Sequence, residues 1–216
     1  MKLAVFDCDG TLVDGQASIC AAMAAAFAAV GEPAPDLHIV RRMVGLSLPQ
    51  AVRHLAPALD EIHVAQAVDA YKQAFRAARA DGSLQQPLYA GIADLITRLA
   101  GAGWQLGVAT GMSDRGLTHC LGEHGLSDHF CTLQTADRHP SKPHPAMLEA
   151  ALAEALANAD EAVMIGDTVY DIQMARDARV RAIGVDWGYH EPAELLAAGA
   201  EWVAASPAEL GDYLLR

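Results

Sequence analysis

Residues 3–12 decide the fold of this chain, and they read Leu3-Ala4-Val5-Phe6-Asp7-Cys8-Asp9-Gly10-Thr11-Leu12. Four consecutive apolar residues followed at once by acids and a glycine are typical of a short buried strand that ends in a turn. The next segment with this pattern comes only at residues 104–109. We therefore expect an insertion between the first and second strands.

The insertion is predicted to be helical. Its apolar residues recur at helical spacing and are Ala-rich, and glycines and prolines such as Gly31, Pro33 and Pro57 interrupt them. The expected helices cover residues 16–30, 37–44, 48–55 and 61–80. We predict a helical cap domain at residues 15–83, and an α/β core formed by residues 1–14 and 84–216.

Strands and helices alternate from Gly91 onward. The expected helices are residues 92–102, 113–124, 145–156, 170–178 and 192–198. The expected strands are residues 104–109, 129–133, 162–165 and 182–185, with a last short strand near Trp202. Alternation with short connections is typical of parallel βαβ units. The sequence thus predicts an α/β fold, a Rossmann-like doubly wound parallel sheet with an inserted α-helical cap.

The composition limits the possible partners. The chain has 216 residues, 15 Lys plus Arg against 27 Asp plus Glu, a formal charge of -12 and 52% hydrophobic residues. This is enough apolar material for a core, and the acidity argues against a nucleic-acid partner, which needs clustered basic residues. The longest apolar run, residues 19–30, is shorter than the roughly 20 residues that span a bilayer. We expect a cytoplasmic protein with no membrane partner, present as a monomer or homodimer.

Polar residues follow the expected strands directly. Ligands of open parallel sheets bind beyond the carboxyl ends of the strands, so these residues should meet at one edge. The candidates are Asp7, Asp9, Gly10, Thr110, Gly111, Lys142, Asp167 and Asp171. Clustered carboxylates need a cation, and oxygen ligands suit Mg²⁺, while a further carboxylate can act as a nucleophile. A lysine, a threonine and close-approaching glycine backbone would bind a phosphate.

These residues resemble the four ordered motifs of the haloacid dehalogenase-like hydrolase superfamily. The motifs are Asp7-Cys8-Asp9-Gly10-Thr11-Leu12, Thr110, Lys142 and Gly166-Asp167-Thr168-Val169-Tyr170-Asp171. The resemblance covers the whole chain, and the helical insert resembles the cap of phosphoglycolate phosphatase-like members.

The resemblance implies a role for each motif residue. Asp7 would be the nucleophile that attacks phosphorus, and Asp9 would protonate the leaving alcohol and then activate water. Mg²⁺ would be bound by the Asp7 carboxylate, the Asp9 backbone carbonyl and Asp167, with Asp171 supporting the ligand shell. Thr110 would hydrogen-bond a phosphoryl oxygen. Lys142 would pair with both the nucleophile and the phosphoryl group, and Gly10 and Gly111 would bring backbone close to phosphate.

Several residues depart from the patterns of particular subfamilies, and these departures reduce the number of activities to be expected. Met112 stands where many relatives carry a lysine. The cap has Gly45-Leu46-Ser47-Leu48 where sugar-phosphate mutases have Gly-x-Ser-Arg, which argues against a mutase. Residues 41–43, Arg-Arg-Met, lack the cap lysine of phosphonate-cleaving relatives, and the acid at Asp9 is absent from dehalogenases. The combination favours phosphoester hydrolysis.

Alternatives remain open for several residues. Thr110 could cap the helix that begins near Ser113, Lys142 could be a solvated surface lysine, and Asp171 could serve only the first turn of a helix. Cys8 is expected to point away from the site, because neighbouring strand residues face opposite sides. Three histidines lie in loops that could reach the cleft: His139, His144 and His190.

The sequence as a whole predicts a Mg²⁺-dependent phosphatase acting on a small phosphorylated metabolite, of the phosphoglycolate or sugar phosphate type, through an aspartyl-phosphate intermediate. A pyrophosphatase or phosphomutase of the same superfamily is the alternative enzyme. A non-catalytic regulator that keeps the fold is the alternative from another class.

Overall fold

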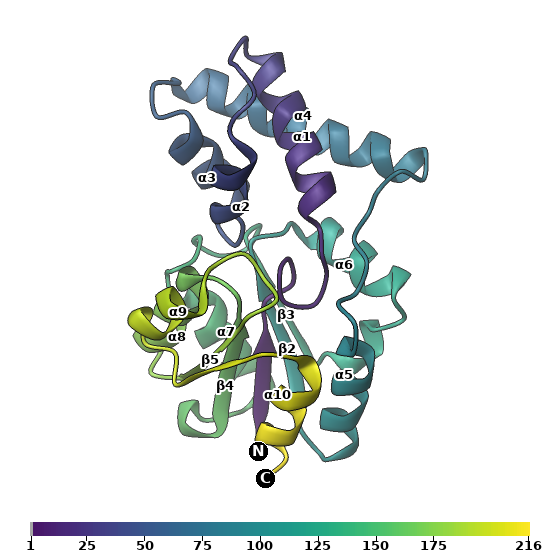
Figure 1. The fold of residues 1–216 in the computed structure, drawn as a ribbon, viewed down its shortest axis with the longest axis vertical. Helices are drawn as coiled ribbons and strands as arrows, with labels where there is room; N and C mark the ends of the chain where they lie inside the picture. Colours follow the sequence, from purple (N-terminus) through teal and green to yellow (C-terminus); the bar gives the residue numbers. More distant parts are fainter. Residues whose placement is uncertain (1) are drawn as a thin grey trace.

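A six-stranded parallel sheet in the order β3-β2-β1-β4-β5-β6 forms the core of the computed structural model, which describes residues 2–216 (Figure 1). The strands are β1 (Leu3–Phe6), β2 (Gln105–Thr110), β3 (Thr132–Thr135), β4 (Ala162–Gly166), β5 (Arg181–Val185) and β6 (Trp202–Ala204). The predicted doubly wound parallel sheet is therefore confirmed. The strand order reverses at β1, so ligands are expected at the carboxyl ends of β1 and its neighbours.

Alternating side chains of β1 explain the two helical layers. Ala4 and Phe6 belong to the apolar cluster on one face of the sheet, whereas Leu3 and Val5 belong to the cluster on the other. The first face is covered by α5 (Ile92–Gly101), α6 (Asp114–Glu123) and α10 (Pro207–Leu214). The second face is covered by α7 (Ala146–Ala155), α8 (Val169–Asp177) and α9 (Pro192–Ala198). A strand buried on both faces reads as a continuous apolar run, as residues 3–6 do.

The cap consists of four helices above the carboxyl ends of the strands (Figure 1). They are α1 (Gln16–Ala29), α2 (Leu37–Arg42), α3 (Leu48–Leu55) and α4 (Glu61–Ala80). Asp36 and Asp60 cap α2 and α4 by accepting backbone hydrogen bonds, which explains where these two helices begin. The cap has an apolar cluster of its own, in which Phe27, Val52 and Val64 are buried.

Two antiparallel segments join the cap to the core. Val13 pairs with Leu88, and the Asp14 N–H donates to the Pro87 carbonyl over 2.8 Å. Just above this crossing, Ser18 Oγ donates to the Gln85 carbonyl and accepts from the Gln85 N–H. We propose that the cap is residues 15–83 and the core residues 1–14 and 84–216, since the two connections meet at these positions.

The third strand differs from the sequence prediction. It covers Thr132–Thr135 instead of 129–133, and Ser127–His129 is a single turn of 3-10 helix, as is Ala159–Glu161. The shift arises because the strand contains polar residues that are nonetheless buried, so its pattern resembles that of a loop.

Helix α10 was not predicted from the sequence. Its start signals are nevertheless present: Ser206 Oγ accepts from the Glu209 N–H, and Pro207 occupies the first helical position.

Two further predictions concern the membrane and the cysteines. Within residues 2–216 no helix combines the length and apolarity needed to cross a membrane. All four cysteines are free. Cys8 is buried in the apolar cluster with its Sγ 3.9 Å from that of Cys120 on α6, and it thus points into the α5/α6 layer as expected.

Candidate active site

Asp7 and Asp9 lie where β1 ends, and Asp7 directly follows the last residue of the strand. The Asp7 N–H donates to the Ile165 carbonyl of β4 over 2.9 Å, which continues the strand pairing and fixes the acid beside the end of β4. The following turn depends on Gly10, whose φ is 93° and where a Cβ would lie 2.2 Å from Asp167 Oδ2. Only glycine allows the turn to approach this second carboxylate so closely.

Three buried carboxylates converge at this edge of the sheet. One carboxylate oxygen from each of Asp7, Asp167 and Asp171 lies within 4.8 Å of the others. Asp167 is held from both sides, since its Oδ1 accepts from Thr11 Oγ1 over 2.8 Å and its Oδ2 from the Tyr189 N–H over 3.0 Å. The structure thus brings Asp7, at the start of the chain, together with Asp167 and Asp171 near its other end.

Lys142 is the buried cation of this group. Its Nζ lies 2.5 Å from Asp171 Oδ1, in a hydrogen bond, and 2.8 Å from Asp7 Oδ1, in an ion pair whose angle is not that of a hydrogen bond. The other Asp171 oxygen, Oδ2, accepts from the N–H and the hydroxyl of Thr168, completing a capping box at the start of α8. The alternative of a solvated surface lysine is wrong, because Lys142 is completely buried.

The electrostatics show a site with excess negative charge. Burial raises the pKa of Asp7 to about 6, although Lys142 acts against this rise, and burial followed by the charge of Asp7 raises the pKa of Asp9 to about 7. Burial and the neighbouring acids also raise the pKa of Asp167 well above its usual value. Burial alone would lower the pKa of Lys142, but Asp171 and Asp7 outweigh it and raise that pKa. A single buried cation therefore faces four carboxylates, and a further cation would relieve their repulsion.

Thr110 and Gly111 face this cluster from the end of β2. Thr110 is buried, and its Oγ1 accepts from the Met112 N–H over 3.2 Å. The helix that follows is capped instead by Ser113, whose Oγ accepts from the Gly116 N–H over 3.1 Å. The hypothesis that Thr110 caps this helix is therefore wrong, and its hydroxyl remains available as a donor at the site.

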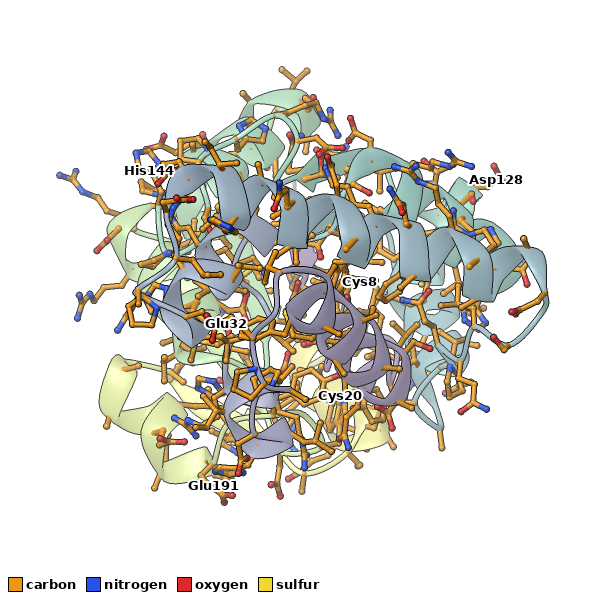
Figure 2. All side chains as sticks on the ribbon, turned by 90° about the horizontal axis from the view of Figure 1, so that it is seen from above. Cys8, Cys20, Glu32, Asp128, His144 and Glu191 are labelled. Carbon is orange, nitrogen blue, oxygen red and sulfur yellow. The ribbon has the colours of Figure 1, made fainter. Side chains whose placement is uncertain are left out.

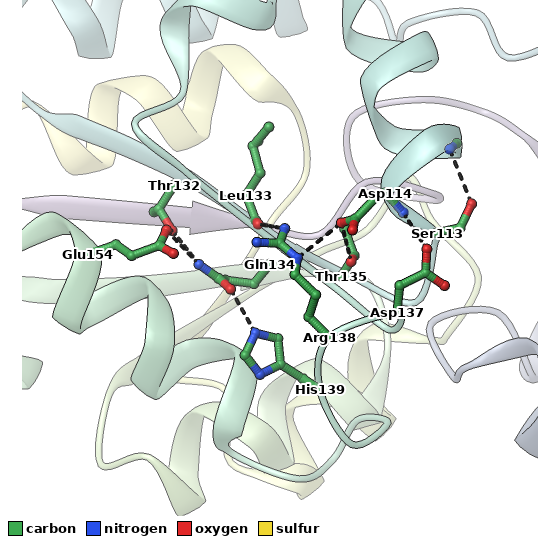
Figure 3. Close-up of polar contacts among 11 residues, drawn as sticks. Ser113, Asp114, Thr132, Leu133, Gln134, Thr135, Asp137, Arg138, His139 and Glu154 are labelled. Atoms are coloured by element: carbon green, nitrogen blue, oxygen red, sulfur yellow. Dashed lines mark hydrogen bonds and ion pairs between the residues drawn. The ribbon is translucent and has the colours of Figure 1, made fainter.

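A polar network holds the loop that carries Lys142 (Figure 3). Gln134 Nε2 donates to Thr132 Oγ1 and to Glu154 Oε2, both over 2.7 Å, and Gln134 Oε1 lies 2.7 Å from His139 Nε2. On the other side Asp114 Oδ1 accepts from Thr135 Oγ1 over 2.6 Å and pairs with Arg138. These bonds satisfy the buried polar residues of β3 and fix the start of the loop 136–143, so Lys142 is positioned by the strand it follows.

A partly open cavity of about 640 Å³ lies between this edge of the sheet and the cap. Asp7, Asp9, Thr110 and Gly111 lie on its core side, together with Ser141. All four cap helices contribute residues to its wall. A cavity of this volume accommodates a small-molecule ligand.

Several contacts hold the cap against the core near the cavity. Ser141 Oγ accepts from the Ser47 N–H over 2.7 Å, and Arg42 forms a two-pronged pair with Glu194, with nitrogen to oxygen distances of 3.0 and 2.6 Å. His190 Nδ1 accepts from the Val169 N–H, so its Nε2 donates to the Arg42 carbonyl. Gly111 of the core also lies directly against the Leu46 carbonyl of the cap. The approach is so close that a Cβ at residue 111 would lie 2.4 Å from that oxygen.

Of the three histidines considered above, His139 lines the cavity and is held by its hydrogen bond with Gln134, and His144 is exposed. His190 joins cap and core.

Two further residues lie near the acids, and sequence reasoning missed one of them, Gln86. The amide of Gln86, in the segment that returns from the cap, is close enough to Asp9 to lower its pKa, but neither Gln86 Nε2 nor Asp9 Oδ1 has a hydrogen-bond partner within residues 2–216. Tyr189 packs its ring beneath the Arg41 guanidinium at 5.8 Å and gives its N–H to Asp167. No sequence signal pointed to Gln86, whereas Tyr189 follows the fifth strand and was expected from the sequence either to line the pocket or to serve as a structural aromatic residue.

A parallel α/β sheet that carries an acid cluster at its carboxyl edge, covered by a helical cap inserted after the first strand, defines a class of capped α/β enzymes. Within that class, the chain belongs to the haloacid dehalogenase-like hydrolase family, whose model matches residues 4–185. The chain is an enzyme of this hydrolase family.

Individual relatives agree with this assignment. The chain is 35% identical over 202 residues to the probable phosphatase IndB of Dickeya dadantii, covering 91% of this chain and 86% of the relative. It is 28% identical to the phosphoglycolate phosphatase of Vibrio vulnificus, covering 100% and 96% of the two chains. Among solved structures, a predicted phosphatase from Clostridium acetobutylicum matches with a TM-score of 0.89 and 27% identity over 99% of this chain and 98% of that one.

Proposed function

We propose that this enzyme is a Mg²⁺-dependent phosphatase that hydrolyses the phosphate ester of a small metabolite through an aspartyl-phosphate intermediate. The observation that carries the proposal is the position of Asp7. Its carboxylate is buried at the floor of the cavity, its Oδ2 has no hydrogen-bond partner within the described residues, and Lys142 Nζ lies 2.8 Å from its Oδ1. A carboxylate oriented in this way is suited to attack a phosphorus atom beside it.

The neighbouring residues supply the remaining steps. An Asp7 oxygen forms a bond to phosphorus as the bond to the ester oxygen breaks, and Asp9 gives its proton to that leaving oxygen. Asp9 then takes a proton from water, which attacks the same phosphorus and releases inorganic phosphate and free Asp7. Burial keeps the pKa of Asp9 near 7, so both of its protonation states are accessible at neutral pH. Thr110 and Lys142 would bind the phosphoryl oxygens.

The acid cluster fits a magnesium ion. Asp7 Oδ2 is buried without a partner, and the cluster supplies only oxygen ligands, which Mg²⁺ prefers. Asp7, Asp167 and the Asp9 carbonyl would hold the ion, which when bound supplies positive charge against the phosphoryl oxygens. Both Asp171 oxygens already accept from Lys142 and Thr168, which supports a role for Asp171 as the residue that orients Lys142.

The substrate class rests on the relatives. Proteins named phosphoglycolate phosphatase match the whole chain, and the volume of the cavity suits a small ester. We therefore propose phosphoglycolate or a sugar phosphate as the type of substrate.

The experiment that tests this function is phosphate release from a panel of small phosphomonoesters, with Mg²⁺ and with excess chelator. Wild type should release phosphate only with the metal, and Asp7→Asn should release none, because an amide cannot serve as the nucleophile. Asp128→Asn, an exposed acid on the core, is the matched control and should retain wild-type turnover. A well-folded wild type that releases phosphate from no ester would contradict the proposal, as would turnover in Asp7→Asn.

A further inference from the structure

Four basic residues around the cavity have no acidic partner. Lys72, Arg76, Arg79 and Arg115 line its wall, yet none forms an ion pair within residues 2–216. The chain has 27 acidic residues for 15 basic ones, so an unpaired cation is not explained by a shortage of acids. Seven other lysines and arginines of residues 2–216 do pair with acids, among them Arg42, Arg98 and Arg181, whereas Lys2, Arg41, Arg179 and Arg216 also form no ion pair.

The four cations come from both sides of the cleft. Lys72, Arg76 and Arg79 follow one another at spacings of four and three on α4, which places them along one face of that helix. Arg115 lies on α6 of the core. Helix α4 crosses the molecule between the sides marked by His144 and Asp128, and its far end lies above α6 (Figures 1 and 2).

Arg79 and Arg115 line the same cavity and repel each other, and the opposing effect of Glu123 on Arg79 is the smaller one. Burial and then the charge of Arg115 lower the pKa of Arg79, and the Arg79 Nε atom is buried without an acceptor. A buried donor without a partner is costly, and so is a like charge beside it. An anion bound between the two guanidinium groups would satisfy the donor and offset the repulsion.

The cations lie on the leaving-group side of the reaction centre. Thr110, Gly111 and Lys142 surround the phosphoryl side, whereas Tyr71 of α4 is close to Asp9, the acid that serves the leaving oxygen: burial and then Asp9 raise the pKa of its hydroxyl. The ring of Tyr71 stacks on that of Phe75 with centroids 4.9 Å apart, and both line the cavity. Arg79 follows Tyr71 by eight residues, about 12 Å along the helix axis.

We propose that the leaving group of the substrate carries a second anionic group, a phosphate or a carboxylate, which binds between Arg79 of the cap and Arg115 of the core, beside Lys72 and Arg76. This inference rests on the proposed phosphatase function and specifies its substrate. The leaving group passes over the Tyr71 and Phe75 rings, so it is longer than a two-carbon acid. Of the two substrate types proposed above, this inference therefore selects a sugar phosphate over phosphoglycolate. Because the second anion bridges cap and core, its binding favours the closed state in which Asp9 is shielded from water.

The test compares kcat/KM for esters that differ by one anionic group. Glucose 6-phosphate is paired with 6-phosphogluconate for a carboxylate, and fructose 6-phosphate with fructose 1,6-bisphosphate for a phosphate. Ethyl phosphate is paired with 2-phosphoglycolate as a short pair. For each pair the ratio is kcat/KM of the ester with the second anionic group divided by kcat/KM of the ester without it. This ratio is measured for wild type, Arg79→Gln, Arg115→Gln and a control. The control, Arg179→Gln, removes an exposed arginine outside the cavity.

In wild type the ratio should exceed about tenfold for at least one sugar pair, since hydrogen bonds between charged groups contribute roughly ten- to hundredfold. The pair with the larger ratio identifies a carboxylate or a phosphate. Arg79→Gln and Arg115→Gln should each bring this ratio toward one, mainly through KM, and Arg179→Gln should keep the wild-type ratio. Arg115 is exposed on the core, so its variant remains informative even if Arg79→Gln does not fold.

Two outcomes would overturn the inference while the phosphatase function stands: hydrolysis with all ratios near one, or ratios that Arg79→Gln and Arg115→Gln leave unchanged. A greater ratio for the short pair than for the sugar pairs would contradict the position of the anion on Arg79 and Arg115. If wild type hydrolysed no ester, the proposed function itself would fail.

Discussion

Lys142 and Asp171 form a hydrogen-bonded ion pair in which Nζ lies 2.5 Å from Oδ1, and both side chains are completely buried. The pair directs the ammonium toward Asp7, since the opposite Asp171 oxygen is fixed by the hydroxyl and the N–H of Thr168 at the start of α8. Asp171 therefore fixes the ammonium group of Lys142, whereas the hydrogen bonds of β3 fix the start of the loop that carries this residue. The position of this cation depends on residues from two separate elements.

Replacement of Lys142 by Met should remove the charge that neutralises the phosphoryl group and lower kcat by about 100- to 1,000-fold. It should also destabilise the metal-free protein by about 3–5 kcal/mol, because Asp7 and Asp171 are left buried without a cation. Steady-state kinetics and denaturant unfolding in chelator measure the two effects. Asp171→Asn should lower kcat as well, whereas Asp177→Asn, on the exposed side of the same helix, should not. Wild-type kinetics in Lys142→Met would refute the assigned role.

Replacement of Asp9 by Asn should leave substrate binding largely intact and lower kcat by about 100- to 10,000-fold, the usual contribution of a general acid and base. The loss should be smaller for an ester with a good leaving group, such as p-nitrophenyl phosphate, because that oxygen needs no proton to depart. Comparison of kcat for this ester and for an alkyl phosphate checks the assignment. An equal loss for both esters would indicate that Asp9 acts on the hydrolysis of the intermediate alone.

Much of this arrangement could be predicted from the sequence, for physical reasons. The run Leu3 to Phe6 is apolar because β1 is buried on both faces, and the acids follow at once because parallel strands end at a common edge. The placement of Asp7, Asp167 and Lys142 together follows from the same rule, although their roles in catalysis stay predictions.

The parts that escaped prediction depend on contacts between distant segments. Strand β3 is buried but polar, because Gln134 and Thr132 bond to Glu154 of α7, and no local pattern reveals such a partner. Gln86 lies near Asp9 only because the segment that returns from the cap pairs with the segment that enters it, as Leu88 does with Val13. The cluster of Arg79 and Arg115 likewise exists only when the cap lies over the core.

Substitution of Gly111 by Ala should disturb cap closure. A Cβ there would lie 2.4 Å from the Leu46 carbonyl oxygen and 2.8 Å from that of Gly45, and backbone atoms cannot move aside as a flexible side chain can. We expect kcat/KM to fall by about tenfold or more, with faster hydrogen exchange of residues 45–47. In contrast, Gly122→Ala, where no atom lies within 4 Å, should keep wild-type activity and stabilise α6 by up to about 1 kcal/mol. Unchanged kinetics in Gly111→Ala would show that the closed position is not the one that limits turnover.

The pair between Arg42 of the cap and Glu194 of the core should make closure sensitive to acid. The hydrogen bonds from Arg42 lower the pKa of Glu194 from 4.5 to about 2. Because the folded pKa is the lower one, the stabilisation is present above pH 4.5 and is lost as the pH falls toward 2. Both side chains are about one third exposed, so solvent screening limits the coupling to about 0.5–1 kcal/mol.

A double-mutant cycle of Arg42→Gln and Glu194→Gln, with hydrogen exchange of the cap contacts as the readout of opening, checks this expectation. The coupling should be constant from pH 7 to 5 and decline below 4.5. The pair of Arg53 with Glu61 is the matched control, since it is also two-pronged, at 3.2 and 2.5 Å, but lies entirely within the cap. Its removal should leave cap opening unchanged. If both cycles altered opening equally, the effect would come from the stability of the cap itself, and the contact across the cleft would have no special part in closure.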